Sequence, residues 1–66
     1  MFIDCKKLQE IHRKQAPGAS DGAFAYTIGL GSLAYQRSKR SKRINVGAGV
    51  LNRLNSLYGI STEDIK

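Results

Sequence analysis

A glycine between two short segments with apolar residues at helical spacings, within residues 20–43, most constrains the fold of this chain. Phe24 and Ile28 are four residues apart, a spacing that places both side chains on one face of a helix over residues 21–28. Gly29 follows, and glycine is the residue that most readily takes the left-handed conformation in which helices end. The pattern predicts a short helix followed at once by a turn.

A second short helix is predicted over residues 32–40, immediately after this turn. Tyr35 is its one large side chain that is expected to point toward the core. The outward face then carries Gln36, Arg37 and Arg40. The second helix of the pair is therefore expected to expose polar and basic side chains.

Sixty-six residues allow one domain, 1–66, and a chain of this size buries only about 60 % of the surface that its unfolded form exposes. Hydrophobic residues make up 41 % of the chain, which is enough for one core and argues against disorder. Capping and stop residues predict three further helices: 5–15, 48–58 and a final turn after Ser61. The predicted fold class is all-α, with four or five short helices.

The helix over residues 48–58 is the most hydrophobic, and it is expected to form the back wall of the core. The residues behind this prediction are Val50, Leu51, Leu54, Leu57 and Tyr58. Ile44 is expected to be an isolated apolar anchor before this helix. The intervening glycine-rich loop is not preceded by a strand and has no Lys-Ser/Thr after it, so it does not match a phosphate-binding loop.

No catalytic or metal-binding constellation can be assembled from this sequence. Cys5 and His12 are the only cysteine and histidine. Seven residues along a helix separate them by about 10 Å, which is too far for a shared metal or a proton transfer. We expect a partly buried thiol, a histidine at the core edge or on the surface, no metal, no cofactor and no enzymatic activity.

The chain shows no secretory or membrane-spanning pattern. No apolar run approaches the roughly 20 residues that a membrane helix needs, and the N-terminal MFIDCKK passes at once into charged residues. A single cysteine favours a reducing compartment. We expect a cytoplasmic protein of a bacterium, a bacterial virus or a mobile element.

The formal net charge is +6, and the excess of basic residues lies in one run over residues 37–43. Its basic members are Arg37, Lys39, Arg40, Lys42 and Arg43. Such a run attracts phosphate polyanions and releases their counterions on binding. A solvated, solubilising loop is the alternative explanation.

The order of these residues resembles the helix-turn-helix of the phage repressor and Cro family, also called the Xre family. The family has a Ser, then Leu and Ala four and five residues later, then Ile-Gly-Val. The matching residues here are Ser20, Phe24, Ala25, Ile28, Gly29 and Leu30. Tyr35 falls where the family places the buried aliphatic residue of its recognition helix. The family's ending, a leucine-rich helix followed by Gly-Val-Ser and a short acidic turn, is resembled by Leu51, Leu54, Gly59, Ile60, Ser61, Glu63, Asp64 and Ile65.

The chain departs from the family pattern at several positions. Ser38 stands where the family often has a buried Ile or Trp. Asp21 stands where many members have a glutamine that contacts phosphate, so this contact is not transferred. Lys39-Arg40-Ser41 replaces the family's Glu-Arg-Gly, and the turn after the first helix is about two residues longer.

The resemblance implies a lambda-repressor-like domain that acts as a transcriptional regulator and places residues 32–40 in the major groove of double-stranded DNA. The residues expected at base edges are Ser32, Leu33, Gln36, Arg37 and Arg40, with a core contact as the alternative for Leu33. The residues expected at phosphates are Lys39, Lys42, Arg43 and Asn45. Family members usually dimerise on two half-sites, so a homodimer is expected, without a membrane or a small-molecule substrate as partner.

Three alternatives remain open. An accessory factor for recombination or plasmid control would bind DNA with the same surface. A protein-interaction module, such as an antitoxin or inhibitor, would not need the basic run. Non-specific binding to RNA or single strands would need exposed aromatic side chains for stacking. For a second copy or a protein partner, the candidate surface residues are Met1, Phe2, Ile3, Tyr58, Ile60 and Ile65.

Overall fold

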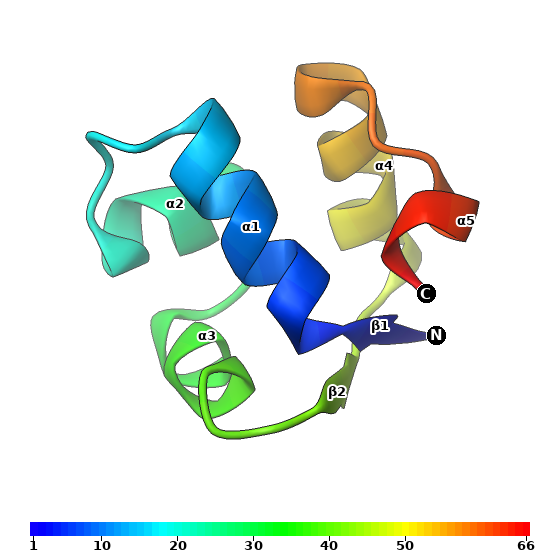
Figure 1. Ribbon diagram of the computed structural model, residues 1–66, viewed down its shortest axis with the longest axis horizontal. Coiled ribbons are helices and arrows are strands. Elements are labelled where there is room, and N and C mark those ends of the chain that lie inside the picture. The colour runs from blue at the N-terminus through cyan, green and yellow to red at the C-terminus, as the bar shows by residue number, and fades with distance from the viewer.

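Five helices and one two-stranded sheet make up the computed structural model, which describes residues 1–66 (Figure 1). In chain order the elements are β1 (Phe2–Asp4), α1 (Cys5–Gln15), α2 (Asp21–Thr27), α3 (Ser32–Ser38), β2 (Arg43–Asn45), α4 (Ala48–Tyr58) and α5 (Thr62–Ile65). The predicted helices are present. None of them combines the length and the apolar character that crossing a membrane requires.

The sheet corrects the predicted all-α class, because the chain is mostly but not purely helical. β1 pairs antiparallel with β2, and Ile3 lies opposite Ile44, the residue predicted to be an isolated anchor. Past the strands, the Cys5 N–H donates to the Lys42 carbonyl at 2.9 Å, and the Val46 N–H donates to the Met1 carbonyl at 2.8 Å. The sheet therefore holds the end of the basic run against the start of α1.

The helix boundaries follow from local capping chemistry. The side chains of Asp4, Ser20 and Ser61 each accept a hydrogen bond from a backbone N–H in the first turn of the helix that follows. Gly29 and Gly59 take positive φ angles of 76° and 67°, so the chain turns after α2 and after α4 in the left-handed conformation. The left-handed turn at Gly29 and the final helical turn after Ser61 confirm what the sequence predicted.

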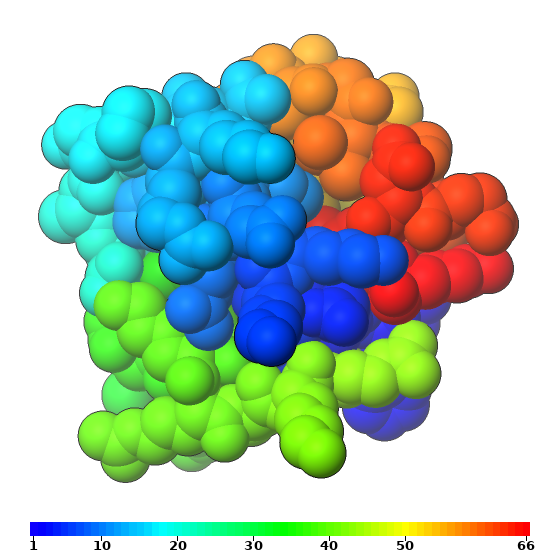
Figure 2. All heavy atoms as spheres, in the orientation of Figure 1, coloured from blue at the N-terminus to red at the C-terminus, as the bar shows by residue number.

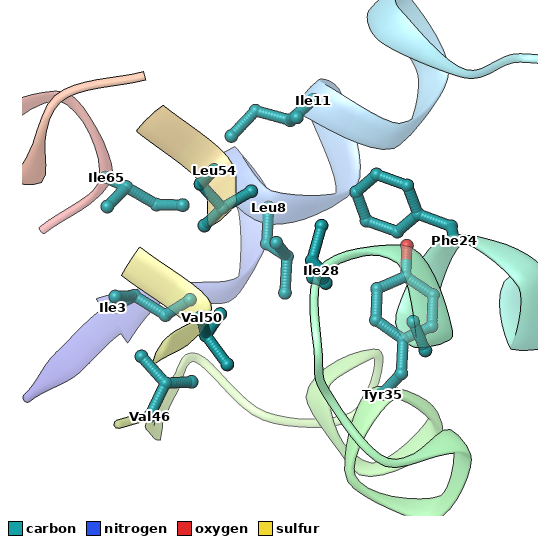
Figure 3. Close-up of a cluster of buried hydrophobic side chains, with 11 residues drawn as sticks. Ile3, Leu8, Ile11, Phe24, Ile28, Tyr35, Val46, Val50, Leu54 and Ile65 are labelled. Carbon is teal, nitrogen blue, oxygen red and sulfur yellow. The ribbon is translucent and has the colours of Figure 1, made fainter. Parts of the chain in front are cut away.

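One hydrophobic core joins all the elements, and Figure 3 shows its side chains converging from the helices and from β1. Tyr35 reaches from α3 toward Phe24 of α2, with 5.5 Å between the ring centroids. The prediction that Leu57 lies in the core is wrong, since 52 % of this residue is exposed. The last turn of α4 covers the core with Tyr58 instead, whose ring lies 6.1 Å from that of Phe24.

Candidate nucleic-acid interface

The outward face of α3 and the turn after it expose polar and basic side chains around one leucine. All five residues predicted at base edges are exposed, namely Ser32, Leu33, Gln36, Arg37 and Arg40. Leu33 is 73 % exposed, so the alternative of a core contact for this residue is excluded. The helix ends at Ser38, earlier than predicted, and Arg40 therefore lies in the turn that follows it.

The opposite face of α3 is fixed to the core by Tyr35. Its hydroxyl lies 2.7 Å from His12 Nδ1, and His12 Nε2 lies 2.8 Å from the Ala19 carbonyl oxygen. Since that carbonyl only accepts, Nε2 carries a proton and donates to it. The imidazole also stacks on Phe24 at 4.4 Å. His12, at the core edge as expected, thus ties α1 to both α2 and α3.

Ser38 replaces the large apolar residue that the resemblance predicts at the end of α3. Its side chain is fully buried, and its Oγ donates to the carbonyl of Tyr35 at 2.5 Å. No buried side-chain polar atom in the protein lacks a hydrogen-bond partner. A small hydroxyl that bonds within its own turn therefore fills this position without a polar penalty.

Asp21, in the first turn of α2, binds the side chains of Gln36 in α3 and of Lys39, the residue that follows α3. Its Oδ2 accepts a hydrogen bond of 3.2 Å from Gln36 Nε2 and forms an ion pair with Lys39 Nζ. Its Oδ1 lies 3.8 Å from His12 Nδ1. The hydrogen bonds from Lys39 and then Gln36 hold the pKa of this carboxyl below its usual value. The sequence did not reveal this network, because its members lie on three separate elements.

The basic segment, residues 37–43, begins in the last turn of α3. It runs along one edge of the molecule, where Figure 2 shows it as a lime-coloured band below the start of α1. Arg37, Arg40, Lys42 and Arg43 are exposed, and none of them forms an ion pair. Lys6, from the first turn of α1, lines a shallow hollow together with Lys42 and Arg43. Lys6 was not predicted, because only the β1–β2 pairing brings it to this edge.

Asn45 differs from the other predicted phosphate contacts. Its Oδ1 accepts a hydrogen bond of 2.7 Å from the N-terminal ammonium of Met1, which also donates to the Val46 carbonyl at 2.9 Å. The side-chain oxygen of Asn45 is thus engaged within the protein. Lys39 is engaged as well, through Asp21, which leaves Lys42 and Arg43 as the predicted phosphate contacts without an ion-pair partner.

Two of the candidate surface residues for a second copy are unavailable. Ile3 and Ile65 are 0 % and 1 % exposed, because both pack in the core. Tyr58 and Ile60 are half-buried, whereas Met1 and Phe2 remain exposed.

The thiol of Cys5 is buried, and this burial raises its pKa. No group of three His, Cys, Asp or Glu side chains is placed to hold a metal ion.

The surface formed by α3 and the basic segment offers guanidinium, ammonium and amide donors around one exposed leucine. Guanidinium and ammonium groups bind phosphate oxygens, and guanidinium and amide groups can also bind the edges of bases. Asp21 is the one carboxylate that forms an ion pair or a side-chain hydrogen bond with this surface, and Asp4 lines the hollow beside Lys6, Lys42 and Arg43. No protein-family model matches the chain, and the comparisons with curated proteins and with solved structures likewise found no match.

Proposed function

We propose that this protein is a sequence-specific, double-stranded DNA-binding transcriptional regulator of the helix-turn-helix type, with a lambda-repressor-like domain. The observation that carries the proposal is the two-sided character of α3. Its inner face is anchored through Tyr35, whereas its outer face exposes Leu33, Gln36 and Arg37 beside the basic segment. An α-helix of this kind fits the major groove, where base edges are distinguishable.

The side chains divide into two classes of contact. Arg37 and Arg40 suit the N7 and O6 acceptors of guanine, Gln36 suits adenine, and Leu33 suits the methyl group of thymine. Ser32, at the start of α3, lies at the end of the helix that approaches the bases in this motif. Lys42 and Arg43 suit phosphates, and phosphate contacts position a protein without reading sequence.

Homodimerisation on DNA belongs to the same proposal. A single domain of this size makes a small interface, and two copies on two half-sites double it. Sedimentation with and without the selected duplex tests this point. A complex with one protein chain per duplex at saturation would contradict the dimer and leave the DNA-binding function intact.

Selection of bound duplexes from a random DNA library, at two salt concentrations, tests the function itself. We expect a short consensus that persists at the higher salt, because base contacts release fewer counterions than phosphate contacts do. Binding without a consensus that disappears as salt rises would overturn the proposal. The basic segment would then be only a polyanion anchor.

A further inference from the structure

We propose that Asp21 is a specificity-determining residue, which restrains Gln36 and Lys39 so that binding to arbitrary DNA is weakened and base reading is sharpened. This role rests on the proposed function. It comes from the pairing of one α2 carboxylate with two residues of the DNA-facing surface. A carboxylate at this place is neither buried nor needed for a cap, because Ser20 caps α2.

The restraint on Gln36 follows from the chemistry of the two side chains. An ionised carboxylate only accepts hydrogen bonds, so Gln36 must turn its amide nitrogen toward Asp21, as the 3.2 Å distance shows. One N–H and the amide oxygen of Gln36 then remain free. This donor–acceptor pair is the one that adenine requires at its N7 and N6 positions. Asp21 thereby fixes which way the amide faces before DNA arrives.

The restraint on Lys39 is electrostatic. Lys39 must leave Asp21 before it can approach a phosphate, because the carboxylate holds its ammonium group. The other charged or titratable groups near this carboxylate are His12, whose Nδ1 lies 3.8 Å from Oδ1, and Tyr35 and Arg13, which line the same pocket. Arg37 and Arg40, by contrast, have no acidic partner. Asp21 thus removes one cation from sequence-independent binding and leaves the guanidinium groups available.

Asp21→Asn tests both restraints, because the variant keeps the shape of the side chain and removes its charge. We expect affinity for a random duplex to rise about three- to tenfold near 0.1 M salt, and the slope of log K against log salt to steepen by about one. We also expect the preference at the base that Gln36 reads to fall about tenfold, since an asparagine can donate or accept and no longer orients the amide.

The matched control is Glu63→Gln, which changes the net charge equally but removes a carboxylate of α5 that pairs with Lys66. Thermal melting of each variant establishes that it folds. If Asp21→Asn does not fold, Lys39→Gln provides a second test. Since Asp21 already neutralises Lys39 in the wild type, Lys39→Gln should leave unchanged both the ratio of consensus to random-duplex affinity and the salt slope. If the slope of log K against log salt is steeper for the wild type than for Lys39→Gln, Lys39 binds phosphate in the wild type, and the proposed restraint by Asp21 is wrong.

The outcomes separate this inference from the proposed function. A wild-type protein that selects no consensus would overturn the function and the inference together. A wild-type consensus that Asp21→Asn reproduces, with the same salt slope and the same base preference, would overturn only the role of Asp21. Equal effects of Asp21→Asn and Glu63→Gln would do the same, because net charge alone would then explain them.

Discussion

At the scale of single residues, we expect ionisation of Tyr35 to make the stability of the fold depend on pH in the alkaline range. Burial raises the pKa of its phenol from 10.0 to about 12, so the fold favours the neutral form. The stabilisation is complete below pH 10 and is lost as the pH rises toward 12, a difference of about 2–3 kcal/mol for two pKa units. Urea unfolding of the wild type and Tyr35→Phe over this range measures it. The variant has no phenol to ionise, so its free energy of unfolding should fall less as the pH rises. An equal fall in both proteins would mean that ionisation of Tyr35 is not the cause.

Arg37 and Lys42 are expected to separate base reading from phosphate binding. Both are exposed and have no ion-pair partner. Arg37→Ala should weaken binding to the consensus by about 1–3 kcal/mol and relax preference at particular bases, whereas Lys42→Ala should weaken all sequences alike and reduce the salt slope by about one. Anisotropy titrations on consensus and scrambled duplexes measure both effects, with Lys14→Ala on the far end of α1 as control. Equal loss on every duplex for Arg37→Ala would remove it from base reading.

At the scale of elements, the β1–β2 pair is expected to be a stabilising clamp. Ile3 is fully buried in β1, while its neighbour Phe2 is 57 % exposed. Ile3→Ala should lower the free energy of unfolding by about 2–5 kcal/mol, and Phe2→Ala by less than about 0.5 kcal/mol. Hydrogen exchange adds a local readout, since the Cys5 amide bonded to Lys42 should exchange faster in Ile3→Ala. Similar losses in both variants would mean that burial in β1 does not stabilise the fold.

The difference between what sequence predicts and what it misses also lies at this scale. Caps such as Ser20 and left-handed glycines such as Gly29 act within one turn, so local rules found the helices and most of their ends, although α3 ends at Ser38 and not at residue 40. The strands have three residues each, too few for an alternating pattern, and their pairing joins distant segments. The exposed face of α3 was predictable from periodicity. The Asp21 network was not, because its contacts depend on how α2 and α3 cross.

At the scale of the whole molecule, a chain of 66 residues is expected to gain a large share of its stability from its ligand. A ligand that binds only the folded state, at a free concentration 100 times Kd, adds about 2.7 kcal/mol. For a domain of this size that raises Tm by about 10–20 °C. Thermal melting with the consensus duplex should show this rise, and a scrambled duplex should show less as salt increases. Identical shifts with both duplexes would contradict sequence-specific binding.

From the separation of β1 and β2 in the chain, we expect their pairing to form after the local helices. Met1 and Asn45, which bond to each other, are 44 positions apart in the chain, so the sheet closes a loop that contains α1, α2 and α3. Local helices form in about a microsecond, whereas a contact between distant segments first has to overcome the entropy of loop closure. During synthesis β1 leaves the ribosome before β2 does, and it has no pairing partner until β2 has been made. The positively charged edge is therefore assembled only when the two ends of this loop meet.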